Sequence, residues 1–128
     1  MFDWLRRLSA RRIPPHIELL PDGFDVVAAH GERYTVRWVS VTRIAAYKVD
    51  LLTTDEIVLA FEVVELPGKV RIVSEESPGF RDLRPAMQER FAISPAWFGD
   101  VMKPAFAPND RVLYARPDMD ASQQPTAR

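Results

Sequence analysis

The chain has 128 residues, of which 47% are hydrophobic, so it suits one domain built around one core. It contains no cysteine, which excludes disulfides and thiolate chemistry. Seventeen basic residues against eighteen acidic ones give a net charge of -1 without a basic stripe, which argues against nucleic acid as a partner.

Residues 1–12 have the pattern of a basic amphipathic helix. One helical face carries the apolar side chains of Met1, Trp4, Leu5 and Leu8. The positive charges come from Arg6, Arg7, Arg11 and Arg12. Such a helix binds an anionic membrane, where each basic residue contributes about 1 kcal/mol. Alternatively, the apolar stripe covers an open end of a sheet, and we favour this because isolated helices of about 12 residues are marginal in water.

Alternating apolar and polar residues predict antiparallel strands over residues 16–74. The apolar or alternating runs are 16–20, 24–29, 33–38, 45–51, 57–66 and 70–74. Turn residues separate them, among them Pro21-Asp22-Gly23 and Pro67-Gly68. Between Trp38 and Ile44 apolar residues fall on every third position, which indicates a bend or one helical turn where the chain crosses between sheets. About six strands therefore precede residue 75.

The run 57–66 is apolar on both of its faces. One face carries Ile57, Leu59, Phe61 and Val63, and the other carries Val58, Ala60, Glu62 and Val64. A nearly apolar second face, interrupted by one carboxylate, is typical of a central strand whose outer face is partly covered.

The spacing of apolar residues changes to that of a helix in the segment 78–102. The first stripe consists of Phe80, Leu83, Met87 and Phe91. Two starts fit this stripe: Ser77 as the cap with Pro78 in the first turn, or Asp82 as the cap with Pro85 in the first turn. With the earlier start, Pro85 lies inside the helix, where a proline costs about 3 kcal/mol and produces a kink.

A second short helix is expected from Pro95 to Met102, after a Ser94 cap. Residues 103–110 have the composition of a proline-punctuated loop, and residues 111–115 that of a final edge strand or a strap on the core. Residues 116–128 are polar without periodicity, so we expect a flexible tail there and a single globular domain over residues 1–115.

No catalytic, metal-binding or cofactor motif stands out. His16 and His30 lie near strand ends without a clustered carboxylate motif, so we interpret both as ordinary surface or partly buried residues and expect no metal. The pairs Asp55-Glu56 and Glu75-Glu76 are interpreted as solvated loop charges, because adjacent residues on a strand point to opposite faces. None of the five glycines forms a phosphate-binding loop, so no cofactor is expected.

Large aromatic side chains suggest either a binding patch or a core. The residues concerned are Trp38, Trp97, Phe98 and Phe106. Core packing is the favoured interpretation, but Phe106 lies between two prolines, which lower the entropy cost of presenting its ring. The candidate partner-binding residues are Trp4, Arg6, Arg7, Arg11, Trp97 and Phe106. An edge strand near Val112 also leaves a homodimer open.

Several stretches resemble those of small uncharacterised bacterial proteins. They are residues 38–44, 46–51 and 54–57, followed by Pro78-Gly79-Phe80, Trp97 and Pro104-Ala105-Phe106. This resemblance covers residues 34–114 and implies no activity. More distantly, strands followed by a bend and a helix across an open end are similar to pleckstrin-homology-like (PH-like) domains. That resemblance implies seven strands and one C-terminal helix, and the second helical segment and final strand depart from it.

We therefore expect an α+β fold. It would be an antiparallel sandwich or partly open barrel of about six to seven strands, with an N-terminal amphipathic helix and C-terminal helices. No run approaches the roughly 20 apolar residues that span a bilayer, and no signal peptide is seen, so the expected location is the cytoplasm.

For function, the sequence favours a non-catalytic module that binds an unidentified protein, for example an immunity-type protein that caps a toxin. One alternative is peripheral membrane association through the basic N-terminal helix. Another is an unrecognised hydrolase or small-ligand-binding protein, which would need a deep polar pocket enclosing His16 or His30 with a carboxylate.

Overall fold

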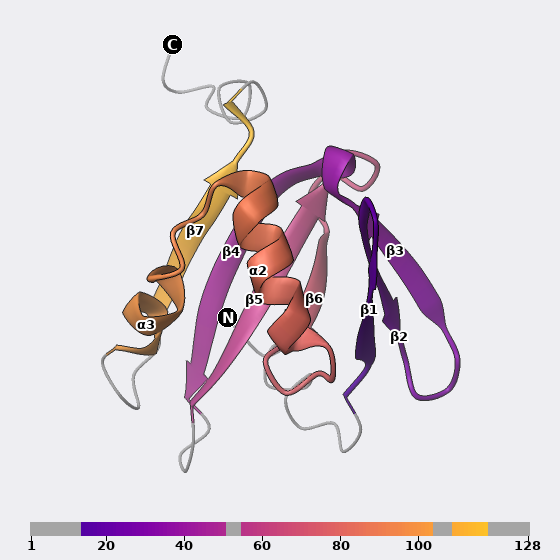
Figure 1. The fold of residues 1–128 in the computed structure, drawn as a ribbon, viewed down its shortest axis with the longest axis horizontal. Coiled ribbons are helices and arrows are strands. Elements are labelled where there is room, and N and C mark those ends of the chain that lie inside the picture. Colours follow the sequence, from indigo (N-terminus) through magenta and orange to yellow (C-terminus); the bar gives the residue numbers. More distant parts are fainter. Residues whose placement is uncertain (1–13, 51–54, 104–108, 118–128) are drawn as a thin grey trace.

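The residues that the structure describes form two antiparallel sheets and two helices, so the fold is α+β. This computed structural model describes residues 14–50, 55–103 and 109–117. The elements in chain order (Figure 1) are β1 (His16–Leu20), β2 (Gly23–Val27), β3 (Arg33–Arg37), η1 (Trp38–Ser40), β4 (Val41–Asp50), β5 (Asp55–Val63), β6 (Val70–Ser74), α2 (Phe80–Phe91), α3 (Trp97–Met102) and β7 (Asn109–Ala115). The expected helix over residues 1–12 and most of the expected tail lie outside the described residues.

The first sheet has the strand order β1-β2-β3. Its register places Glu18 beside Asp25 and Asp25 beside Thr35, so these polar side chains share one face. Neighbouring residues such as Ile17 and Phe24 point to the opposite face and are buried. The strands predicted from alternation in this part of the chain are confirmed.

The second sheet has the strand order β6-β5-β4-β7. Strands β4, β5 and β6 form a meander, with Ala46 opposite Leu59 and Leu59 opposite Val73. Strand β7 returns from the helices and pairs with β4 in antiparallel orientation. The predicted edge strand is therefore confirmed, and it begins at Asn109 rather than at Arg111.

The chain crosses from the first sheet to the second through η1, a short 3-10 helix, as the change of apolar spacing predicted. The backbone N–H of Trp38 donates a hydrogen bond to the carbonyl of Asp22 at 2.9 Å. At the same crossing, Nη2 of Arg116 donates to the carbonyl of Val39 at 2.6 Å. Arg116, which was expected to begin the tail, is thus attached to the folded domain.

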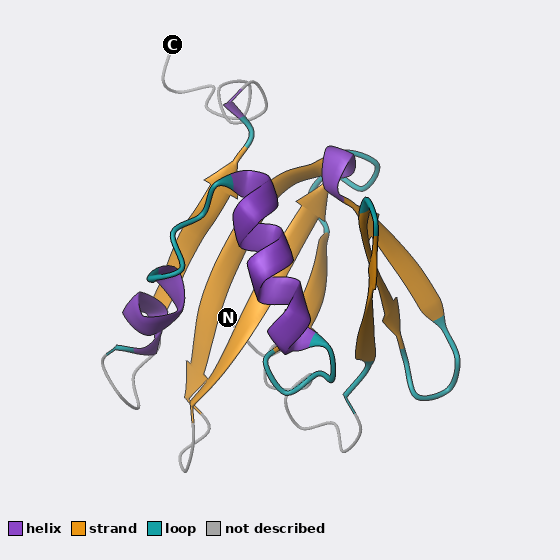
Figure 2. Ribbon diagram, viewed as in Figure 1, coloured by secondary structure: helices purple, strands orange, loops and turns teal. Residues whose placement is uncertain are grey.

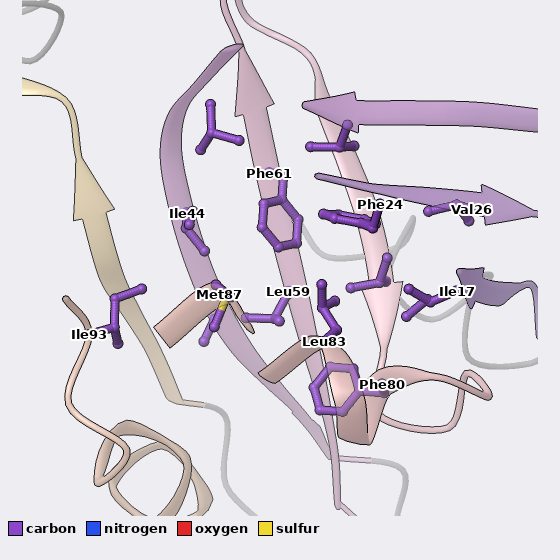
Figure 3. Close-up of a cluster of buried hydrophobic side chains, with 14 of the residues drawn as sticks. Ile17, Phe24, Val26, Ile44, Leu59, Phe61, Phe80, Leu83, Met87 and Ile93 are labelled. Atoms are coloured by element: carbon purple, nitrogen blue, oxygen red, sulfur yellow. The ribbon is translucent and has the colours of Figure 1, made fainter. Parts of the chain in front are cut away.

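The main core lies between the two sheets and α2 (Figure 3). Phe24 of β2 meets Phe61 of β5 edge to face, with the ring centres 5.0 Å apart. Helix α2 contributes Phe80, Leu83 and Met87, three of the four residues of the predicted stripe, and all three are buried. Burying each such side chain contributes about 1.5–3 kcal/mol, so this core joins both sheets and α2.

Helix α2 starts after Gly79, which differs from both predicted starts. Gly79 has a φ of 96°, and a Cβ at this position would lie 2.2 Å from the carbonyl oxygen of Ile17. Ser77 provides no side-chain cap; only its carbonyl accepts the first N–H of the helix, at 3.0 Å. The Asp82 start is wrong, because Pro85 lies inside α2, which continues through it (Figure 2). The close approach of β1 selects the start, and local sequence does not show that contact.

Helix α3 begins at Trp97 rather than at Pro95 and ends at Met102 as predicted. The hydroxyl of Ser94 accepts the N–H of Ala96 at 3.2 Å. Ser94 therefore stabilises the turn before α3, and the helix itself starts after Ala96 without a side-chain cap.

Candidate binding surface

A groove of about 270 Å³ lies between β7 and the segment that joins α2 to α3. Its apolar lining includes Ile93, Trp97 and Val101, and its charged lining includes Asp100 and Arg111. We call this space the β7 groove. The accessible lining of the groove is mixed, with apolar and polar groups side by side, and a binding site needs both kinds.

Strand β7 forms one wall of the groove and is an edge strand. It pairs with β4 on one side, and no other strand in the described part of the chain pairs with it. Asp110, Arg111 and Val112 are exposed, and Val112 retains 53% of its accessible surface. An open strand edge carries unpaired backbone donors and acceptors, which are a template for a further strand.

A register shift limits how far such pairing extends. Ala45 lies opposite Val112 and Ile44 lies opposite Tyr114, so Leu113 is an extra residue in β7. Extra residues of this kind bend a strand and disrupt its ladder. A partner strand would therefore find regular pairing over residues 109–112.

The helical wall of the groove is fixed at the C-terminus of α3. Nζ of Lys48 donates to the carbonyl of Met102 at 2.8 Å and lies 3.6 Å from the Asp55 carboxylate. The side-chain amide of Asn109 donates to the carbonyl of Lys103 at 2.6 Å. These bonds satisfy carbonyls that a helix end leaves without intrahelical partners, so α3 is held beside β7.

Helix α3 is also attached to α2. Nε1 of Trp97 donates to Oε1 of Gln88 at 2.8 Å, and Trp97 is only 5% exposed. The guanidinium carbon of Arg84 lies 3.9 Å from the centre of the Phe98 ring, and burial lowers the pKa of Arg84. The structure places Trp97 in the core, where it forms part of the wall of the β7 groove.

A polar network covers the outward face of the first sheet. Asp25 is buried and accepts hydrogen bonds from the hydroxyl of Thr35 and, at 2.6 Å, from Nη1 of Arg33. Glu18 binds Arg33 at 3.0 Å and lies 2.8 Å from Nε2 of His16. Thr35 and Arg33 lower the pKa of Asp25, and His16 and Arg33 lower the pKa of Glu18. These groups satisfy one another, as in a structural ladder of cross-strand pairs.

A second cavity of about 330 Å³ opens between the first sheet and β6. Its lining includes His30, Glu32, Tyr34 and Arg71, and Arg71 stacks on Tyr34 with its guanidinium carbon 4.4 Å from the ring centre. His30 and Glu32 lie 3.1 Å apart with 72% and 74% of their side-chain surface exposed. The cavity therefore carries this pair at its mouth and does not enclose an imidazole with a carboxylate.

The two acidic pairs differ from the prediction of solvated loop charges. Asp55 and Glu56 belong to β5. The Asp55 side chain is only 9% exposed, and Glu56 is buried and accepts a hydrogen bond from the hydroxyl of Ser74. Oε1 of Glu75 accepts the N–H of Ile57 at 2.6 Å, and burial raises the pKa of this carboxyl. The prediction is wrong for Asp55, Glu56 and Glu75, because strand pairing in the second sheet brings them against groups that the local sequence does not show.

The other candidate partner-binding residues lie outside the described residues. They are Trp4, Arg6, Arg7, Arg11 and Phe106. Over the described ranges, no group of three or more histidine, cysteine, aspartate or glutamate residues is placed to hold a metal ion. In the same ranges, the helices are too short or too polar to cross a membrane.

Comparisons of the chain with protein-family models, with curated proteins and with solved structures found no match. Any functional conclusion therefore rests on the geometry of the chain itself.

Proposed function

We propose that this protein is a non-catalytic binding module that holds an extended segment of a partner protein along β7. One observation carries this proposal: the open edge of β7 lies directly beside the β7 groove. A strand added at an open edge gains backbone hydrogen bonds, and its alternate side chains enter adjacent hollows.

The chemistry of the groove defines the partner segment. Val101 is 0% and Ile93 8% exposed, so the apolar surface that a partner can reach includes the half-buried Leu113 of β7, and the segment presents an apolar side chain there. Asp100 and Arg111 carry opposite charges and lie in the same lining, which favours polar flanking residues on the segment.

The wall of the groove is formed before the partner arrives. Lys48 and Asn109 fix the end of α3, and Trp97 fixes its start, so little ordering of the module remains to oppose association. An immunity-type protein that caps a toxin is one form of such a module.

The arrangement of a three-stranded and a four-stranded sheet around one core supports the sandwich form of the fold. It also supports the resemblance to PH-like domains, from which α3 and β7 depart. The proposed partner site is formed by α3 and β7, the two elements that depart from PH-like domains, so the resemblance does not imply this site.

The test compares two exposed valines on the two edge strands of the same sheet. Val112 lies on β7 and Val70 lies on β6, and both are exposed. Peptides selected from a displayed random library against the unmodified protein would be titrated by calorimetry against Val112→Lys and Val70→Lys. Lysine on an edge opposes strand addition.

We expect Val112→Lys to weaken peptide binding at least tenfold, about 1.4 kcal/mol, and Val70→Lys to change it less than twofold. Equal losses in both variants, or failure to select any peptide, would contradict the proposal. If the partner is a second copy of the chain, sedimentation of the unmodified protein will show a dimer that Val112→Lys dissociates.

A further inference from the structure

The face of the second sheet that is turned away from α2 and α3 is apolar at its centre, and the buried pair Glu56 and Ser74 lies beside Val58 on the same face. The register places Ala45 opposite Ala60, Tyr47 opposite Val58, and Ala60 opposite Ile72. These side chains therefore point to one side, while Ala46, Leu59 and Val73 point into the main core. With Val49, they define what we call the outer face.

The centre of the outer face is buried although no described element covers it. Val58 is 0% exposed and Ala60 is 3% exposed. Helices α2 and α3 lie on the opposite side of this sheet (Figure 1), and the first sheet contacts that opposite side through Phe24 and Phe61. Neighbouring side chains on one face of a sheet shield each other's sides but leave their outer ends accessible to solvent. Full burial of Val58 therefore requires a layer that covers this face.

The rim of the outer face is open. Val70 on β6 is 44% exposed and Val112 on β7 is 53% exposed, and both lie on this face by register. A buried centre with exposed edges indicates a cover that is narrower than the sheet, such as a single helix.

We propose that residues 1–12 form this cover as an amphipathic helix packed on the outer face. The described chain begins at residue 14, and Pro15 lines the same cavity as Val70 and Ile72 of β6. The N-terminal segment therefore joins the fold at the rim of the outer face.

The length of this segment fits the face. Twelve helical residues extend about 18 Å, and four strands spaced about 4.8 Å apart extend about 14 Å. The other stretches outside the described residues fit less well. Residues 51–54 and 104–108 are too short for two helical turns, and 118–128 has Met119 as its single large apolar side chain.

The side chains are complementary as well. The apolar stripe of the segment contains Trp4, Leu5 and Leu8. On the sheet, Ala45 lies opposite Ala60, and two such small side chains leave room for a large one packed above them. In this arrangement the arginines of the segment face water, and the apolar stripe is not available to a membrane.

The absence of cysteine from the chain allows a direct test by thiol labelling. Ala60→Cys places a thiol on the outer face, and Ala46→Cys places a matched thiol on the opposite, inner face of the same sheet. Each is made in the full-length chain, and the rate of modification by a maleimide is measured under native conditions.

Two further changes are then combined with each thiol. Leu5→Asp with Leu8→Asp puts two carboxylates on the apolar stripe. Arg6→Asp with Arg7→Asp puts two carboxylates on the polar side of the same segment. We expect the leucine changes to speed labelling at position 60 at least tenfold and leave position 46 unchanged, and the arginine changes to alter neither rate more than twofold. Protection of position 60 in every background would overturn the proposal.

The leucine changes could also loosen the whole core, which would speed labelling at both positions. A second measurement, in which the N-terminal segment is unmodified, decides that case. A nitroxide on Val112→Cys lies at the open rim of the outer face. Its paramagnetic broadening should weaken the amide signals of residues 4–8 in the folded protein. Full signal intensity for these residues would overturn the proposal.

Discussion

Replacing Gly79 by alanine should lower the free energy of unfolding by more than the positive φ at this position alone would cost. A left-handed conformation costs an alanine about 1–2 kcal/mol, and the stiffer unfolded chain returns about 0.4–1 kcal/mol. In addition, the new Cβ would lie 2.2 Å from the carbonyl oxygen of Ile17, which forces a backbone shift of the kind that costs about 1–3 kcal/mol. We expect a total loss of about 2–4 kcal/mol in the free energy of unfolding.

Gly31 provides the matched control. Its φ is 98°, and no atom of the described residues would lie within 4 Å of an added Cβ. Gly31→Ala should therefore lose about 1 kcal/mol, the conformational part alone.

Urea unfolding followed by circular dichroism measures both changes, and the dependence on urea should be the same in each variant. The excess loss in Gly79→Ala reports the packing of the α2 start on β1. Equal losses at the two positions would refute this reasoning.

Two further predictions concern groups near the start of α2 and β5. Ser77→Ala should not destabilise the protein, because the buried hydroxyl has no partner among the described residues. The control Ser94→Ala removes a hydroxyl that accepts an N–H and should lower the free energy of unfolding by about 0.5–1 kcal/mol. A loss of about 1 kcal/mol for Ser77→Ala in urea unfolding would instead show that Ser77 caps the helix. Glu75→Gln keeps the oxygen that accepts the Ile57 N–H and removes a carboxylate whose pKa is raised above 4.5 in the folded state, mainly by burial. Because the folded state binds this proton more tightly, it gains stability below pH 4.5, and that stability is lost as the pH rises through the folded pKa. Glu75→Gln should therefore raise the stability at pH 7 and flatten the pH dependence of stability above pH 4.5. Thermal unfolding at a series of pH values measures both effects. The exposed Glu76→Gln is the comparison: its charge also raises the pKa of Glu75, but less than burial does, so it should flatten the dependence only in part, and a flattening as large as that of Glu75→Gln would contradict the assignment.

Much of the fold could be predicted from the sequence because its strands have clear local signals. The period of two in β4 and β5, the polar turn residues and the change of spacing at Trp38 are all properties of neighbouring residues. The apolar second face of β5 likewise predicted a partly covered central strand, and Val58 is buried.

The remainder depends on contacts between residues far apart in the chain. The start of α2 at Gly79 is selected by the carbonyl of Ile17, and the burial of Glu56 follows from its pairing with Ser74. Neither contact has a sequence signal at the position concerned.

The candidate site was predictable only in part. The edge strand around Val112 follows from a short apolar run near the end of the chain. The groove beside it arises from the packing of α3, for which Lys48 and Asn109 supply the attachments. The residue types at these two positions do not indicate which carbonyls the side chains will meet.

The return of β7 to β4 also has a consequence for the order of folding. Strands β4, β5 and β6 are neighbours in the chain, so their pairing closes short loops. Pairing of Ala45 with Val112 closes a loop that contains two strands and both helices, at a higher entropy cost. Contacts between distant residues slow folding, so the β4–β7 ladder should form late. The edge proposed to receive a partner segment is thus created last, after the core that supports it.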